Sequence, residues 1–252
     1  MRRYLRRDRR KGPDPRETVI SAVHANIYLH YVFDLWADTS RKKRAHGDVV
    51  VIRYADDTVL GFQQKDDAYT FTEALAGRLA KFGLELHPDK TRLIRFGRFA
   101  AAQRRQRGLG KPETFEFLGF THYCTQSCQN GWLKIARVTS RKRLRAQLRA
   151  VKDNLRRRIN RSIGETGRWL RRVIQGHMNY FAVPGNGERV SGFVFRVSRL
   201  WLKMLRRRSQ RHRIPWPRFA VILNFFFPKV RILHPQPLHR FDARTRGRSP
   251  VR

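Results

Sequence analysis

Apolar residues in the first part of the chain recur first with the spacing of a helix and then with that of strands. Six of them recur at spacings of three and four residues, which predicts a core helix with one apolar face: Val19, Ile20, Val23, Ile27, Tyr31 and Leu35. Two β-rich runs, Val49–Ile52 and Thr58–Phe62, then predict strands on either side of Ala55-Asp56-Asp57. The short connection places the acidic pair at or near the tip of a tight hairpin.

The next segment continues this mixture of helix and strand. A helix is predicted over Lys65–Phe82, ended by Gly83, because its apolar residues keep helical spacing: Phe71, Leu75, Leu79 and Phe82. Three more strands are predicted, the last two joined through Asn130-Gly131: Arg92–Phe96, Thr114–Tyr123 and Trp132–Val138. The fold class is therefore α+β, and residues 19–138 are expected to form one unit with an antiparallel sheet and helices.

Helical patterns dominate from residue 139, so residues 139–227 are expected to form an all-α bundle. Thr139 and Ser140 are candidate N-caps for a helix over Arg141–Ile159, which has an apolar stripe: Leu144, Leu148, Val151 and Leu155. Further helices are predicted over Gly167–Phe181 and Phe193–Arg213, the latter with an inner side formed by Trp201, Met204 and Leu205. Residues 228–252 are rich in Pro, Arg and His, and this composition predicts a tail that is extended or disordered until it is bound.

The net charge of the chain indicates which class of partner it binds. Its 56 Lys and Arg residues outnumber 19 Asp and Glu, giving a formal charge of +37 and a sequence pI of about 11.7. Such a field attracts polyanions, and each neutralised phosphate releases counterions, so nucleic acid is the expected partner. A ribosomal-type structural protein or a membrane-surface protein are the alternatives, and charge alone does not distinguish a binding protein from an enzyme.

Cysteine usage and hydropathy favour a cytoplasmic protein without a membrane partner. No apolar run reaches transmembrane length, and Cys124 and Cys128 are the only cysteines. These two, with His122, have poor spacing for zinc, and no second ligand pair follows, so free thiols are expected. After Arg213 there is no Cys-x-x-Cys pair or catalytic His cluster, which argues against an endonuclease domain.

The acidic pair is the main candidate for chemistry. Asp56 and Asp57 bring two like charges together, and a cation bound between them would relieve their repulsion. Mg²⁺ prefers such hard oxygen ligands, and in phosphoryl transfer it activates the attacking hydroxyl and stabilises the leaving group. An ordinary acidic turn is the alternative. The flanking strands, the Tyr at position 54 and the positive background favour the metal site.

At this point the chain resembles a known family. Tyr54-Ala55-Asp56-Asp57 looks like the Tyr-x-Asp-Asp motif of group II intron reverse transcriptases and maturases, and Gly83–Thr91 and Phe115–Phe120 resemble the family's next two blocks in order and spacing. Leu205–Gln210 with Trp216, and then Ile232–Pro235 with Phe241-Asp242, resemble the thumb and C-terminus of bacterial members. The resemblance implies a partial polymerase palm over residues 19–138 and a maturase thumb over residues 139–227.

The resemblance also implies roles for particular residues. Asp56 and Asp57 would hold catalytic Mg²⁺, Tyr54 would lie near the primer terminus, and Lys90 would approach the phosphates of the incoming dNTP. Simple packing of Tyr54 and a solvated turn position for Lys90 are the alternatives. The block that grips the primer would be Phe117, Leu118 and Gly119, where the missing side chain of the glycine allows the primer backbone to approach closely.

Basic residues of the bundle are the candidates for intron RNA binding. A helix face with almost no opposite charge repels itself without a polyanion, whereas an ordinary solvated face is the alternative. The predicted RNA-binding residues are Arg141, Lys142, Arg143, Arg145, Arg149, Lys152, Arg156, Arg206, Arg207 and Arg208.

The first eighteen residues depart from the family pattern. Asp8, Asp14 and Glu17 are set among Arg and Pro rather than in a hydrophobic strand, and Pro15-Arg16-Glu17 replaces the family's Pro-Gln-Gly turn. Residues 1–18 are therefore interpreted as an irregular, out-of-frame leader on a truncated copy that lacks the fingers and one catalytic Asp. Such a chain would be impaired in catalysis alone, and another polypeptide or a second copy would complement it.

Two functional classes follow from the sequence. The first is an RNA-directed DNA polymerase segment that binds intron RNA and an RNA/DNA primer-template. The second is a maturase without catalytic activity that assists splicing by binding intron RNA. A basic structural protein would require the downstream blocks to be coincidental.

Overall fold

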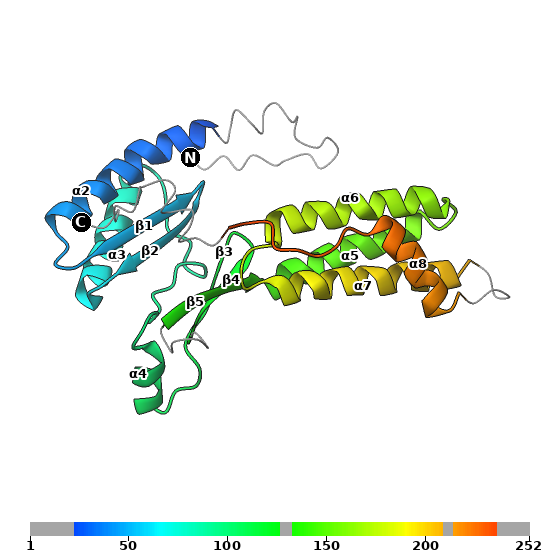
Figure 1. The fold of residues 1–252 in the computed structure, drawn as a ribbon. Coiled ribbons are helices and arrows are strands. Elements are labelled where there is room, and N and C mark those ends of the chain that lie inside the picture. The colour runs from blue at the N-terminus through cyan, green and yellow to red at the C-terminus, as the bar shows by residue number, and fades with distance from the viewer. Residues whose placement is uncertain (1–22, 127–132, 209–213, 236–252) are drawn as a thin grey trace. The chain divides into compact units, whose positions relative to one another are not determined.

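The computed structural model describes residues 23–126, 133–208 and 214–235 (Figure 1). Contacts divide the chain into two units, Met1–Ile94 and Arg95–Arg252. The three-stranded sheet, which the sequence predicted to share one unit with the hairpin, falls in the second unit with the helices. The leader, Cys128, the Asn130-Gly131 turn and residues 236–252 of the tail lie outside the described residues.

In the first unit a long helix and a second helix pack on a two-stranded sheet. Residues 23–29 are helical and continue through η1 (His30–Asp34) into α2 (Leu35–Lys43). The strands β1 (Val49–Tyr54) and β2 (Asp57–Phe62) pair antiparallel, and α3 (Lys65–Ala80) follows. The hydrophobic core consists of Val32, Phe33, Ala37, Phe71, Leu75 and Leu79, with Val51, Leu60 and Phe62 of the sheet packed against it. The predicted hairpin and the helix after it are confirmed.

The predicted buried face of the first helix is wrong. Val23, Ile27, Tyr31 and Leu35 are about half exposed or more, while Val32, Phe33 and Ala37 are buried. The segment carries two overlapping apolar faces, so spacing alone cannot choose between them. The five-residue π-helical stretch η1 also changes the rotation per residue, which shifts the face that a regular α-helix would bury. Val19 and Ile20 lie outside the described residues.

The strand predicted over Arg92–Phe96 is also wrong, since these residues are irregular. A strand requires a neighbour that accepts its hydrogen bonds. Within the part of the chain that the structure describes, one sheet contains β1 and β2 and the other contains β3, β4 and β5, so this segment belongs to neither sheet.

The sheet of the second unit contains β3 (Phe115–Phe117), β4 (Phe120–Gln126) and β5 (Leu133–Thr139), after the short helix α4 (Ala100–Gln106). The segment predicted as one strand over Thr114–Tyr123 is split by a tight turn. Phe117 pairs with Phe120, and the two residues between them, Leu118 and Gly119, both have positive φ, of 50° and 76°. Positive φ at both central positions is the geometry of a type I′ hairpin turn. The helix α4 was not predicted.

Four helices follow the sheet: α5 (Arg141–Arg157), α6 (Ile163–Phe181), α7 (Gly187–Arg206) and α8 (Trp216–Phe226). The first three run side by side, and α8 packs across α6 (Figure 1). Ser140 caps α5 as predicted, accepting a hydrogen bond from the Arg143 N–H. α6 begins before the predicted Gly167, because Ser162 and Glu165 form a reciprocal capping box. α7 begins before the predicted Phe193, and α8 was not predicted.

The core of the bundle is apolar and aromatic. Trp201, Met204 and Leu205 are buried as predicted, as are Leu144, Val151 and Leu155 of the α5 stripe. Leu148 packs at the edge of the same core. None of the described helices combines the length and the apolar character needed to cross a membrane.

One buried polar side chain joins the sheet to the bundle. The Asn186 amide nitrogen donates to Thr139 Oγ1 and to the Phe181 carbonyl, both at 2.8 Å, while its oxygen accepts from the Thr139 N–H at 2.9 Å. Each of these buried groups therefore has a partner, and β5, α6 and the start of α7 are held together.

We predict that Gly167→Ala destabilises the second unit. A Cβ at this position would lie 2.5 Å from Cγ of Phe226, so the ring of α8 would have to move. Such overpacking costs about 1–3 kcal/mol, which outweighs the gain in helix propensity. Gly176→Ala on the same helix is the control, since a Cβ added there would meet nothing within 4 Å and should stabilise the unit by roughly 0.5–1 kcal/mol. Urea denaturation should separate the two variants. Equal stabilisation by both would contradict the close packing of α6 and α8.

A second prediction concerns acid stability. His177 is buried, its Nδ1 lies 2.9 Å from Gln147 Oε1, and its ring stacks on Phe193. Burial lowers the pKa of His177 from 6.5 to about 4, so the folded state binds this proton less readily than the unfolded state. The contribution, about 3 kcal/mol at most, is present above pH 6.5 and is lost as pH falls towards 4. In His177→Leu, the free energy of unfolding measured with urea should depend less on pH between 6.5 and 4. His87→Gln, which changes an exposed histidine, should leave this dependence unchanged. An unchanged slope in His177→Leu would contradict the prediction.

Candidate active site

The acidic pair lies at the connection of the β1–β2 hairpin. Tyr54 pairs with Asp57, and Ala55 and Asp56 form the two-residue turn between them. Ala55 has φ of 53°, which places it in the left-handed region, and Asp57 is the first residue of β2. The prediction that the pair lies at or near the tip of a tight hairpin is confirmed.

The pair and the tyrosine are accessible. Asp56 and Asp57 are exposed, and Tyr54 is 64% exposed. Residues directly opposite in an antiparallel pair point to the same side of the sheet, so Tyr54 and Asp57 share the outer face with Ile52 and Val50. The inner face packs on the core. A ligand therefore reaches the Asp57 carboxylate and the Tyr54 ring from the same face of the hairpin.

Arg53 holds the turn in place. Its Nε and one terminal nitrogen donate to the two oxygens of Asp34, at 2.7 and 2.6 Å, in a two-pronged ion pair. The other terminal nitrogen donates to Asn26 Oδ1 and to the Ala55 carbonyl, both at 2.9 Å. One guanidinium thus ties the long helix to the turn that carries Asp56.

The electrostatics agree with this geometry. The hydrogen bonds from Arg53 hold the pKa of Asp34 below its usual value, and those to Asp34 raise the pKa of Arg53. Both groups therefore stay charged at neutral pH. The Arg53 side chain is 15% exposed and that of Asp34 is 30% exposed, so solvent screens the pair only in part.

The beginning of β1 is fastened by a second carboxylate. Asp67, buried on α3, accepts from the backbone N–H of His46 at 2.9 Å and of Gly47 at 3.0 Å, and it contacts His46 Nδ1 at 2.9 Å. The hydrogen bond with the His46 side chain is the main cause of the lowered pKa of Asp67. Both ends of β1 are therefore fixed by charged side chains that were not among the residues predicted from the sequence.

A sequence signal existed for Arg53 but not for its partner. Alternation along β1 places Arg53 on the inner face with Val49 and Val51, and a charge in such a position needs a counter-charge. Asp34 lies 19 residues earlier on a helix, so spacing along the chain could not have paired the two.

Asp56 and Asp57 fit a magnesium site of the open kind. Neither carboxylate forms an ion pair within the described part of the chain, so their oxygens are available. No group of three or more His, Cys, Asp or Glu residues that could hold a metal occurs among the described residues. Mg²⁺ in sites for phosphate transfer is often bound by one or two carboxylates, with water and substrate phosphates completing the octahedron.

Lys90 lies in a separate turn of the first unit. The backbone N–H of Lys90 and of Thr91 both donate to the His87 carbonyl, at 3.2 and 2.9 Å. The side chain is exposed and makes no hydrogen bond with another described residue. No contact of Lys90 with the described hairpin is seen, so its role at the nucleotide stays a prediction.

The predicted primer-gripping residues form the β3–β4 turn of the second unit. Leu118 and Gly119 are its central residues, and Phe117 ends β3. The Tyr180 hydroxyl donates to the Leu118 carbonyl at 2.9 Å, and the Ser140 N–H donates to the Gly119 carbonyl at 2.9 Å. A Cβ on Gly119 would meet Phe181 at 3.7 Å, which is ordinary contact, so the positive φ is the stronger reason for glycine.

The predicted RNA-binding residues of α5 are exposed along its length, with Asp153 as the only acidic residue of the helix. Two of the three later arginines have structural contacts. Arg206 donates to the Ile214 carbonyl through two nitrogens, and Arg208 donates to the carbonyls of Arg158 and Arg161. These contacts use part of their donor capacity. RNA binding by all ten residues stays a prediction.

Comparison with known proteins identifies the class of the first part of the chain as a nucleic-acid polymerase. Residues 18–122 match the family model described as reverse transcriptase (RNA-dependent DNA polymerase). The chain therefore carries a reverse transcriptase domain over these residues, which include the acidic hairpin, Lys90 and the β3–β4 turn. A search of curated proteins finds no match. Reverse transcriptases typically use Mg²⁺ and bind a template and primer.

We predict that Arg53 is a positioning residue for the acidic turn. Arg53→Met removes the Asp34 pair and the bond to the Ala55 carbonyl, so the first unit should lose about 1–2 kcal/mol. Amide hydrogen exchange at Ala55–Asp57 should accelerate by about tenfold, which is more than at α3.

Arg41→Met is the matched control, because it breaks an exposed ion pair with Asp38 on the helix that also carries Asp34. It should leave exchange at the turn unchanged. Arg53→Lys should restore only part of the protection, since an ammonium cannot form the two-pronged pair. Unchanged exchange at the turn in Arg53→Met would show that Arg53 does not position it.

Proposed function

We propose that this chain is part of a group II intron reverse transcriptase and maturase, with an RNA-directed DNA polymerase palm and an intron RNA-binding thumb. The observation that carries the proposal is the exposed Asp56-Asp57 pair, which lies on a hairpin turn beside Tyr54 within a reverse transcriptase domain. The motif order from Tyr54 to Phe120, and the thumb-like motifs after Leu205, support the finer assignment to intron-encoded enzymes.

In this proposal Asp56 and Asp57 hold Mg²⁺ at the site of nucleotide addition. The ion, when bound, lowers the pKa of the attacking primer hydroxyl and neutralises charge on the leaving pyrophosphate. The two carboxylates supply oxygen ligands from a turn that Arg53 fixes. The aromatic ring of Tyr54, on the same face as Asp57, provides a surface beside the primer terminus.

The thumb would be the basic helical bundle. α5 carries eight Lys and Arg residues against one Asp, and its exposed faces offer donors to phosphate groups. The turn at Leu118 and Gly119 would support the primer backbone, since hydrogen bonds from Tyr180 and Ser140 hold it against α5 and α6.

A second candidate is a maturase that binds intron RNA without polymerising DNA. The dense and largely unpaired charge of α5 favours RNA binding whether or not the carboxylates act. Binding of RNA that weakens with salt is expected of both candidates. Incorporation of dNTPs on an RNA template is expected only of the polymerase.

The test of the metal site is cleavage by bound iron. Fe²⁺ substituted for Mg²⁺ reduces added hydrogen peroxide to hydroxyl radicals, with ascorbate regenerating Fe²⁺, and these radicals cut the backbone near the metal ligands. The full chain should therefore be cleaved near Asp56 and Asp57. The double variant Asp56→Asn/Asp57→Asn should lose this cut, because amides are poor ligands for hard cations. Primer extension with Mg²⁺ and dNTPs, where measurable, should fall by about 100-fold or more.

Asp48→Asn is the control, since Asp48 is an exposed carboxylate at the opposite end of the same hairpin. It should keep both the cut and the extension. Persistence of the cut in the double variant would overturn the proposed metal site. If the double variant loses the cut but the wild-type chain shows no primer extension, the second candidate, a maturase that does not polymerise DNA, would be favoured.

A further inference from the structure

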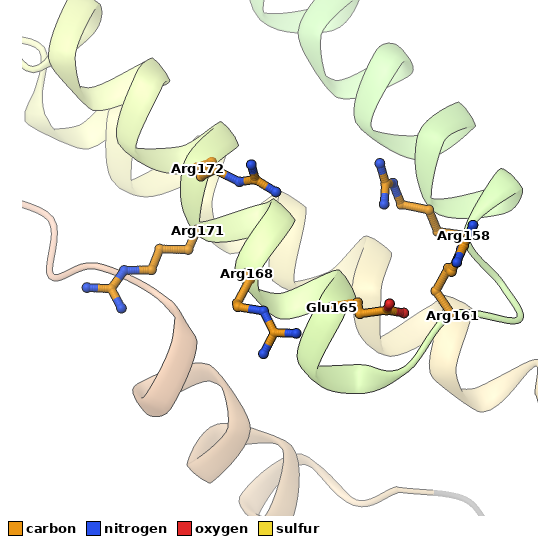
Figure 2. A pocket seen from close by; sticks show the side chains of 6 residues that line it. All are labelled: Arg158, Arg161, Glu165, Arg168, Arg171 and Arg172. Atoms are coloured by element: carbon orange, nitrogen blue, oxygen red, sulfur yellow. The ribbon is translucent and has the colours of Figure 1, made fainter.

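A cavity of about 680 Å³ lies where α5 ends and α6 begins (Figure 2). All the residues that line it are charged: Arg158, Arg161, Glu165, Arg168, Arg171 and Arg172. Arg158 and Arg161 lie in the connection that follows α5, while the other four project from the first turns of α6 (Figure 2). We call this set the α5–α6 arginine site, and its members on α6 are not among the RNA-binding residues predicted from the sequence.

The positive charge of this site is not neutralised within the described chain. None of its five arginines forms an ion pair with a described residue. Glu165 is engaged elsewhere, because its carboxylate accepts from the Ser162 N–H at 3.2 Å in the capping box. Five guanidiniums around one committed carboxylate would repel one another without an anion.

The arginines are partly held in position. The Arg158 guanidinium lies 4.9 Å from the centre of the Trp169 ring, a contact that orients it without using its charge. Arg208 donates to the carbonyls of Arg158 at 3.3 Å and Arg161 at 2.6 Å, and so fixes the backbone of the loop. Because these groups are already held in place, they lose less conformational entropy when a ligand binds.

The lining indicates the class of ligand. Pockets for small molecules are mostly apolar with a few polar groups, whereas the described residues that line this cavity are all charged. One phosphate would leave most of the guanidiniums unneutralised. A run of phosphates on a polymer would engage several of them, and the planar guanidinium pairs with phosphate through two parallel hydrogen bonds.

We propose that the α5–α6 arginine site binds consecutive phosphates of an RNA backbone, an inference that rests on the proposed function of the chain as an RNA-handling enzyme. This contact with RNA would be separate from the one at the β3–β4 turn. The β3–β4 turn meets the beginning of α5 through the Ser140–Gly119 hydrogen bond, and the site lies at the other end of that helix. A 17-residue helix spans roughly 25 Å, so RNA in this site is remote from the primer-gripping turn.

The test uses the full chain and a 30-nucleotide RNA hairpin as the probe. Arg168→Gln/Arg172→Gln removes two exposed guanidiniums one turn apart on α6. Affinity should fall by about tenfold, and the slope of log K against log salt should decrease by about 1.5, as expected for two lost phosphate contacts. Arg168→Lys/Arg172→Lys should keep the slope but recover only part of the affinity. Circular dichroism checks that each variant is folded.

The matched control is Arg196→Gln/Arg199→Gln, which removes the same charge from exposed positions of α7. Its affinity should fall by less than about threefold. Equal loss in the two glutamine variants would overturn the site as a specific one, and so would wild-type affinity in Arg168→Gln/Arg172→Gln. Competition with polyglutamate and with ATP tests the other ligand classes. If one of them displaces the hairpin from the wild type but not from Arg168→Gln/Arg172→Gln, the site would be assigned to an acidic polypeptide or to a free polyphosphate, respectively. Absence of RNA binding by the wild type would instead count against the proposed function.

Discussion

The position of the acidic turn depends on the guanidinium of Arg53. A two-stranded sheet is only marginally stable alone, so β1 and β2 need support from outside the ladder. Packing of Val51, Leu60 and Phe62 on the helices supplies the apolar part of that support. The ion pair with Asp34 and the hydrogen bond to the Ala55 carbonyl supply the directional part, and Asp67 fastens the opposite end of β1. The strand is thus held at both ends, while the carboxylates of the turn stay exposed.

Five acidic residues of this basic chain illustrate two roles. Asp34, Asp67 and Glu165 have their oxygens occupied by donors of the chain itself, and each fixes a local structure. Asp56 and Asp57 form no ion pair with described residues and are exposed. The basic residues divide similarly, since Arg53, Arg206 and Arg208 bind partners of the chain, whereas the arginines at the α5–α6 junction do not pair with described acids. Adjacent or clustered charges of one sign without a counter-charge are the surfaces where we expect ligands of opposite charge to bind.

Local patterns in the sequence were sufficient for the hairpin, α3 and the inner side of the bundle. The acidic tip was predictable because two short β-branched runs joined by a two-residue turn are compatible with few structures other than a β-hairpin. The face of the first helix was not, because Val32 and Phe33 compete with Val23 and Ile27 and only the sheet decides between them. The break in the β3–β4 segment was missed because leucine rarely takes positive φ, and Tyr180 and α5 stabilise that turn from far along the chain. The start of α6 was readable, since Ser162 and Glu165 have capping-box spacing. The contact of Arg53 with Asp34, and the cavity at the end of α5, depend on tertiary structure and lay beyond sequence reasoning.

The hydrogen bonds around Asn186 have a mechanical consequence. Because its amide joins Thr139 to the Phe181 carbonyl, and because Ser140 and Tyr180 bind the turn at Gly119 and Leu118, the sheet and the helices are bonded where they meet. The β3–β4 turn is therefore joined by hydrogen bonds to the beginning of α5 and the end of α6, so a displacement of the turn would be transmitted to both helices.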